Sequence, residues 1–180
     1  MTLKDMKLRV LSLIEEINPD SEYLTDDIDI QEKINYVIDT KNHELARIKH
    51  ISAVESMKVT KDKEIDLYDL DNFYKLGSIK GASYDSFNNF ITFNEDGEAK
   101  IYYYKYPKMI DKDTNDDDYK FEASQDVLEI MPYGIAADLL KSDVSAQYGR
   151  IYQDAYNNAL NMLDIKVADG QIEFVGGING

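Results

Sequence analysis

The sequence contains no cysteine, and long uninterrupted apolar stretches are also missing. Its 180 residues therefore hold no disulfide, no thiolate nucleophile and no cysteine-based zinc site. The apolar runs are short and broken by charged residues, so no segment is expected to span a membrane. The segment MTLKDMKLRVLSLIEEI has charges within its apolar pattern and no small-residue cleavage site, which predicts a helix rather than a signal peptide. We expect the protein to be made and kept in the cytoplasm of its producer.

Positive charge is scarce. Against 35 Asp and Glu residues the chain has 20 Lys and Arg, which gives a formal net charge of −15. Such a surface repels nucleic acid, because phosphate binding needs clustered cations. Hydrophobic residues make up 43% of the chain and aromatic residues 11%, so it can bury a core and is not expected to be disordered. The charge indicates either solubility alone or a surface past which DNA moves without sticking.

Residue sets that carry chemistry are missing as well. The only histidines are His43 and His50, seven positions apart on one predicted helix, and neither belongs to an HExxH pattern. The phosphate-binding patterns GxGxxG and GxxxxGK[ST] do not occur, and Gly176-Gly177 lies too near the C-terminus to cradle a phosphate. The sequence thus predicts no catalytic residue, no cofactor site and no enzyme. A cryptic carboxylate site has no support beyond the large number of acids.

Apolar residues at helical spacing predict four helices. These cover about residues 2–17, 25–50, 124–141 and 144–164. Thr2 is placed to cap the first, and Asn18-Pro19 to end it. Lys41 interrupts the apolar stripe of the second helix, whose middle is therefore expected to be partly exposed.

The two later helices carry their own signals. Ser124 is placed to cap the third helix, and Pro132 predicts a kink or a delayed start. In the fourth helix Tyr148, Tyr152 and Tyr156 follow one another at intervals of four residues. They should form one ridge suited to burial against another helix, in this chain or in a neighbouring subunit.

Between the helix pairs, residues 51–107 change to a β-rich pattern. Lys61-Asp62-Lys63 is expected to turn one strand into the next, and Asp96-Gly97 predicts a hairpin between Phe90–Phe93 and Ala99–Tyr104. We therefore expect a mainly α fold with a β insertion (α+β). A helix pair, a hairpin-rich insertion and a second helix pair would form one small bundle. The expected domain covers residues 1–165, followed by a flexible C-terminal tail at 166–180.

An acidic segment, DKDTNDDD at residues 111–118, offers one metal-binding pattern. Oxygen-bearing residues occur at the spacing of a calcium loop: Asp111, Asp113, Asn115, Asp117 and Glu122. Asp116 stands where the sharp turn requires glycine, and Asp118 where such loops have an apolar residue. A solvated acidic linker is the favoured interpretation, and no metal site is assigned. Calcium binding within 111–122 remains the alternative.

Several motifs together resemble the head–tail connector, or portal adaptor, proteins of long-tailed bacteriophages. In order they are INYVIDTKNHELARI, NNFITF leading through a glycine turn to AKIYYYKYPKMI, an acidic stretch, VLEIMPYGIAADLLKSD and SAQYGRIYQDAYNNALNML. The most telling part is a strand ending in Tyr-x-x-Pro before the acidic loop, followed by a helix rich in small residues and then a tyrosine-rich helix. The resemblance covers about residues 1–165.

The resemblance implies a virion protein of the neck, found in the host cytoplasm before assembly. Such proteins form a ring, usually a dodecamer, beneath the portal. The ring extends the DNA channel and receives the next neck or tail-completion protein. DNA would pass through without specific binding, and portal contact would fall to the terminal residues 166–180. The alternative is a stand-alone acidic module that binds protein or calcium.

Overall fold

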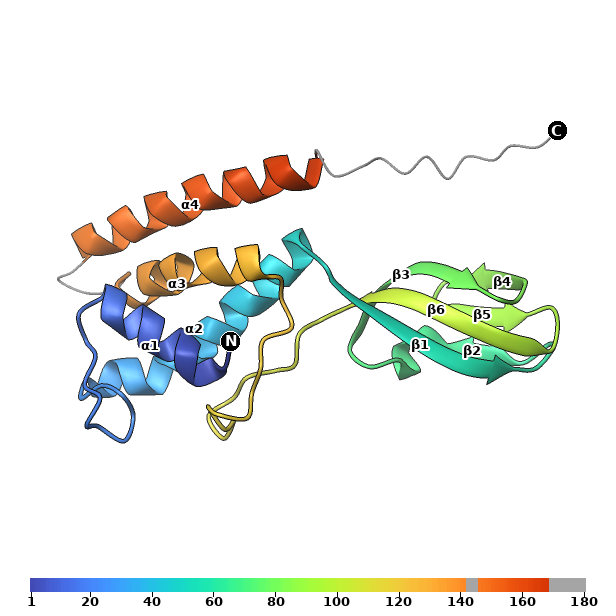
Figure 1. Ribbon diagram of the computed structural model, residues 1–180, viewed down its shortest axis with the longest axis horizontal. Coiled ribbons are helices and arrows are strands. Elements are labelled where there is room, and N and C mark those ends of the chain that lie inside the picture. The colour runs from blue at the N-terminus through green and yellow to red at the C-terminus, as the bar shows by residue number, and fades with distance from the viewer. Residues whose placement is uncertain (142–145, 169–180) are drawn as a thin grey trace.

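The computed structural model describes residues 1–141 and 146–168, with side chains up to Leu163. The molecule is elongated, with four helices at one end and six strands at the other (Figure 1). We call these parts the helical body and the β body, the latter being residues 51–105. The fold is 43% helical and 25% strand, so it is a mixed α/β protein. The predicted mainly α class is wrong, because the segment taken for an insertion forms two sheets with a core of their own.

Four helices build the helical body: α1 (Leu3–Leu13), α2 (Ile28–Ile48), α3 (Gln125–Leu139) and α4 (Ala146–Ala168). A capping box starts α1, in which the Thr2 hydroxyl accepts from the Asp5 N–H and the Asp5 carboxylate accepts from the Thr2 N–H. The Asp27 carboxylate caps α2 in a similar way. Ser124 occupies the cap position of α3 but makes no side-chain capping bond. Pro132 lies inside α3 and is buried.

Two predicted boundaries need correction. Helix α1 stops at Leu13 rather than at 17, because Glu15 adopts a left-handed φ of 60°. The Glu16 N–H then bonds to the Leu11 carbonyl, a closure that normally uses glycine at the left-handed position. Helix α4 continues to Ala168, past the predicted end at 164. The remainder of the predicted tail, 169–180, lies outside the described residues, as do residues 142–145.

Two antiparallel three-stranded sheets form the β body. The first has the order β1-β6-β3, with β1 at Ile51–Val59, β3 at Phe73–Lys80 and β6 at Gly97–Lys105. The second has the order β2-β5-β4, with β2 at Glu64–Asp66, β4 at Tyr84–Phe87 and β5 at Phe90–Phe93. A short 3-10 turn, η1 (Leu67–Asp69), follows β2.

The hairpin expected at Asp96-Gly97 is wrong, whereas the turn expected at Lys61–Lys63, from one strand into the next, is confirmed. The Asp96-Gly97 turn joins β5 to β6, but these strands belong to different sheets. The Lys61–Lys63 turn likewise carries the chain from the first sheet to the second. A tight hairpin instead joins β4 to β5, where Phe87 pairs with Phe90 and Asn88 has a φ of 55°. Asparagine tolerates that left-handed conformation, which two-residue hairpin loops require.

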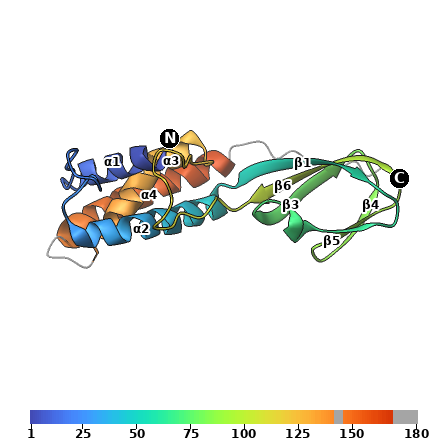
Figure 2. The same cartoon turned by 90° about the horizontal axis from the view of Figure 1, so that it is seen from below.

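The buried apolar residues fall into two clusters, one in each body. In the helical body the cluster joins α1, α2, α3 and α4, with Met6, Ile38, Met131 and Ile135 fully buried. In the β body the two sheets share a core around Ile91, Phe93 and Ile101. The chain crosses between the bodies at 49–50 and again at 106–109 (Figures 1 and 2). Through the described ranges no helix is both long and apolar enough to cross a bilayer.

Candidate interaction surfaces

The acidic segment 111–122 is fastened to α1, although most of its acidic side chains are exposed. Lys7 pairs with Asp116 at 2.8 Å and Lys4 with Asp117 at 3.3 Å. Backbone bonds reinforce these pairs, since the Lys4 N–H donates to the Asp116 carbonyl and the Leu3 N–H to the Tyr119 carbonyl. The segment therefore fixes the start of the first helix, while Asp111, Asp113, Asp117 and Asp118 stay exposed, as the interpretation as a solvated acidic linker predicts.

The five residues at calcium-loop spacing are not brought together. Asp111 accepts bonds from the Thr114 hydroxyl and the Asp113 N–H, which lower the pKa of its carboxyl. Glu122 points elsewhere and pairs with Lys105 at 2.7 Å. Across residues 1–141 and 146–163, no three His, Asp or Glu side chains converge as metal ligands would. This arrangement does not supply the oxygen cage that calcium takes up.

The two histidines lie at the junction of the two bodies. His50 contacts the rings of Tyr74 and Tyr104, with centroids 5.3 and 4.9 Å away. His43 stacks against Tyr106 and its ring nitrogen lies 3.0 Å from the Asp39 carbonyl. Both are half-buried, so they are junction residues rather than freely exposed ones. Aromatic contacts of this kind stabilise the orientation of one body against the other.

Lys105 adds an ionic link at the same junction. It stands at the end of β6 and pairs with Asp71 in the β body at 3.0 Å and with Glu122 ahead of α3 at 2.7 Å. Burial acts to lower the pKa of Lys105, but hydrogen bonds to these two acids outweigh that effect and raise it. The ammonium therefore stays charged and links the β body to the chain ahead of α3.

A buried ionic cluster replaces the exposed patch expected in α2. Lys41 is only 5% exposed and pairs with Glu44 at 2.8 Å and Asp138 at 3.0 Å. Burial acts to lower the pKa of Lys41, but hydrogen bonds to both acids outweigh that effect and raise it. Its ammonium also lies 4.8 Å from the centroid of the Tyr156 ring. The prediction of partial exposure is wrong, because Glu44 of the next turn of α2 and Asp138 of α3 enclose the lysine.

The tyrosine ridge of α4 is divided between inside and outside. Tyr156 is buried and donates to the Glu44 carboxylate at 3.0 Å. Burial, followed by the neighbouring Glu44 charge, raises the pKa of its phenol. Tyr152 is half-buried and donates to the Leu13 carbonyl, whereas Tyr148 is 65% exposed. The expected burial of a whole ridge therefore holds within this chain only for its C-terminal part.

One face of α4 is left without a partner inside the described chain. Tyr148, Ile151 and Met162 follow a helical stripe and are 65%, 58% and 63% exposed. We call these three residues the α4 face. The opposite side of the helix packs on α3, where Gly134 lets the Tyr156 ring approach closely. In Figure 1, α4 lies along the outside of the helical body.

A second surface is a groove of about 590 Å³ between α2 and the chain around Met109. Three large side chains of its wall are strongly exposed: Tyr23 (60%), Tyr36 (73%) and Met109 (74%). Its carboxylates are Glu32, Asp39 and Asp111. Of its two lysines, Lys7 is neutralised by Asp116 and Lys112 is exposed. We call this the α2 groove, which is acidic and partly aromatic.

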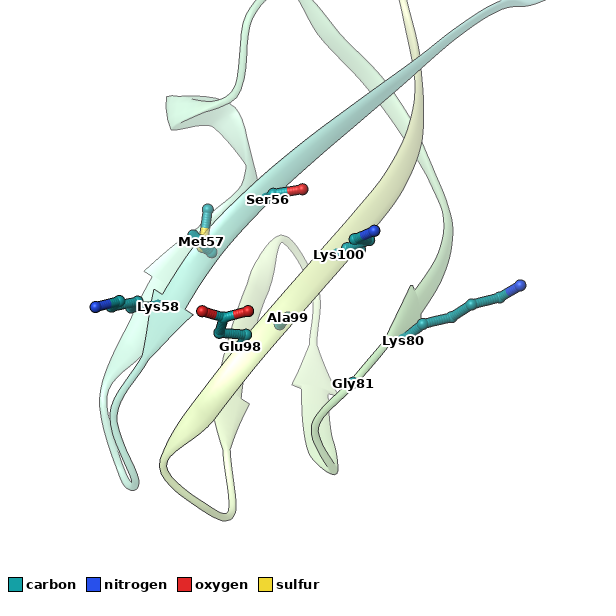
Figure 3. A pocket seen from close by; sticks show the side chains of 8 residues that line it. All are labelled: Ser56, Met57, Lys58, Lys80, Gly81, Glu98, Ala99 and Lys100. Atoms are coloured by element: carbon teal, nitrogen blue, oxygen red, sulfur yellow. The ribbon is translucent and has the colours of Figure 1, made fainter.

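A third surface is a shallow hollow of about 340 Å³ on the outer side of the first sheet. Lys58 of β1, Lys80 of β3 and Lys100 of β6 line it, together with Glu98 and Gly81 (Figure 3). We call the three lysines the lysine face. Sequence reasoning missed it, because the three positions are far apart along the chain and meet only through strand pairing.

No protein-family model matches the sequence, and comparison with curated proteins gives no match.

Proposed function

We propose that the chain is a structural subunit of the neck of a long-tailed bacteriophage. Copies of it would form a ring beneath the portal, extend the DNA channel and join the head to the neck or tail. Its partners would be the portal protein, a downstream neck or tail-completion protein and its own copies, with a dodecamer expected from the resemblance. The motifs quoted above suggest this role.

The observation that carries the proposal is the set of exposed apolar side chains on separate elements. The α4 face and the wall of the α2 groove each leave several large apolar residues more than half exposed. Contiguous exposed apolar surface of this kind marks sites of protein contact. A ring subunit needs several such surfaces, because it contacts two neighbours and a component on each side.

The charge of −15 is compatible with a channel lining. A negative wall offers DNA no clustered cations to bind, so DNA can slide. The same charge adds repulsion that weakens association between free copies, and a portal that brings copies together would favour assembly. This account needs no catalytic residue and assigns none.

Removal of the gene from the producing phage tests the role directly. We expect heads that are filled with DNA but lack tails, together with loss of ring density between portal and tail in electron micrographs. Normal tailed particles from the deletion strain would contradict the proposal and favour a stand-alone protein-binding module.

A matched pair of variants tests the α4 face. Ile151→Asp with Met162→Asp places two charges on the apolar stripe and should reduce incorporation into particles at least about tenfold, since each charge would be buried unpaired. Asn157→Asp with Asn161→Asp adds the same charge at exposed positions of the same helix and should leave incorporation unchanged. Quantitative blotting of purified particles measures both. Equal behaviour of the two pairs would show that the α4 face contacts no partner.

A further inference from the structure

The outer side of the first sheet carries an unusual arrangement of like charges. In the register of the sheet, Lys80 of β3 and Lys100 of β6 stand directly opposite each other. All three residues of the lysine face are exposed, and none pairs with a carboxylate in the described part of the chain. Like charges directly across two strands destabilise a sheet. Glu98 stands opposite Lys58 in the register, so it is Lys80 and Lys100 that lack an acid across the strands and would be neutralised by one from outside, in a chain with a net charge of −15.

Apolar surface adjoins these lysines. Tyr102 and Val54 are cross-strand partners on the same side of the sheet, and they are 37% and 54% exposed. The Lys80 ammonium lies 5.4 Å from the centroid of the Tyr102 ring. In Figure 3 the Lys80 side chain extends away from the sheet, and the Lys58 side chain points out at the opposite edge. The face thus combines aromatic and aliphatic area with cations beside it, as the apolar centre and polar rim of a protein interface do.

The α2 groove has the complementary character. Glu32 and Asp111 are exposed carboxylates, and Tyr36 and Met109 supply apolar area beside them. A surface of lysines around an exposed tyrosine fits such a groove in both charge and polarity. The groove lies between α2 and the chain around Met109, and the lysine face lies on the β body. Figures 1 and 2 show the helical body and the β body at opposite ends of the elongated molecule.

We propose that the lysine face of one copy docks on the α2 groove of the next copy. This inference rests on the proposed function, since it assigns the contact between subunits of the assembly. Because the two surfaces differ, the contact is heterologous, and a pair of copies keeps one free lysine face and one free groove to which further copies can add. Repetition of the same rotation closes a ring.

Nucleic acid is the other class of ligand that lysines beside a tyrosine can bind. The net charge of −15 opposes it, and the groove on the same molecule supplies the acids that the lysines lack. We therefore favour the second copy, and the experiment below distinguishes the two.

Zero-length coupling of carboxylates to amines tests the contact. An equal mixture of unlabelled and ¹⁵N-labelled chain is treated with a carbodiimide, alone at high concentration and with purified portal, and mixed-isotope peptides are identified by mass spectrometry. We expect links between copies from Lys80 or Lys100 to Glu32 or Asp111. Their absence under both conditions, while copies are linked elsewhere, would overturn the inference and leave the proposed function intact.

Charge exchange gives a second readout. Lys80→Glu with Lys100→Glu should weaken self-association by at least about tenfold in sedimentation velocity, or about 1.4 kcal/mol. Mixing this variant with Glu32→Lys should restore part of the loss. The control, Lys61→Glu with Lys63→Glu, makes the same charge change at exposed lysines of the β1–β2 turn and should associate as the unmodified chain does or nearly so.

Two results would overturn the inference: equal association of both double variants, or binding of a single-stranded oligonucleotide by the unmodified chain that only Lys80→Glu with Lys100→Glu abolishes. Failure of the unmodified chain to form any assembly with the portal would instead contradict the proposed function.

Discussion

Gly81 lies where the structure leaves no room for a Cβ atom. It has a φ of +100°, and a Cβ atom there would lie 2.3 Å from the Glu98 carbonyl oxygen. We expect Gly81→Ala to lower the free energy of unfolding by roughly 2–4 kcal/mol, because the backbone must move. Gly97→Ala is the control, since its Cβ would have no atom within 4 Å and its φ is not positive. It should change stability by less than about 0.5 kcal/mol in urea titrations. Similar losses in both variants would contradict the prediction.

Lys41 is the residue whose charge matters most to the helical body. Replacing it with methionine leaves Glu44 without its cation and Asp138 with Lys141 alone, and we expect a loss of about 3 kcal/mol. The control Lys33→Met removes an exposed pair with Asp29 and should cost less than about 0.5 kcal/mol. Thermal and urea unfolding measure both. A Lys41→Met variant as stable as the unmodified chain would show that the buried charges are dispensable.

The sequence could not predict this residue's surroundings. Lys41 appears as a break in an apolar stripe, and only the crossing of α2, α3 and α4 shows what encloses it. Glu44 is three positions away, but Asp138 and Tyr156 come from distant parts of the chain. Similarly, the calcium-like spacing at 111–122 was visible, whereas the lysines of α1 that pair with Asp116 and Asp117 were not.

At the scale of elements, helices were far more predictable than sheets. A period near 3.6 residues is a local signal, and all four predicted helices exist with shifted ends. Strand pairing is not local. The residues of β1 and β6 predict strands, but they do not indicate that these two strands pair with each other. The Asp96-Gly97 signal marked a real turn between strands of two different sheets, while Asn88-Asn89 made the hairpin.

An ion pair joins the C-terminal end of α2 to the start of α3 and makes the free energy of unfolding depend on pH. Lys49 pairs with Asp126 there. Burial acts to raise the pKa of Asp126, but hydrogen bonds, chiefly from Lys49, dominate and lower it to about 2. A depressed carboxyl pKa stabilises the fold above the unfolded pKa of about 4, and this contribution is lost as pH falls toward 2.

We expect Lys49→Met to be less stable than the unmodified chain by about 1–2 kcal/mol at pH 6, and the difference to shrink toward zero near pH 2. Urea unfolding at a series of pH values measures the difference directly, so that the other acids cancel. Lys33→Met provides the comparison, because its exposed pair should give a small difference throughout. A constant difference between pH 6 and pH 2 would argue against an ionic role for Lys49.

For the whole molecule, the effect of ionic strength on self-association distinguishes assembly through the apolar α4 face from assembly through the lysine face and the α2 groove. Copies with a charge of −15 repel one another, and salt relieves that repulsion. If association depended mainly on the apolar α4 face, added salt should therefore strengthen it. If the lysine face and the α2 groove meet, salt screens their attraction and opposes the first effect.

We expect the attraction to dominate, because docked charges lie within a few ångströms whereas the excess acids are spread over the surface. Self-association should weaken about tenfold between low salt and about 0.5 M NaCl, where the screening length falls well below 10 Å. In the variant Lys80→Glu with Lys100→Glu, added salt should instead strengthen self-association, because only the charge repulsion and the apolar contact remain. Sedimentation velocity across a salt series measures both proteins. The same strengthening by salt in the two proteins would assign assembly to apolar contact and remove the lysine face from it.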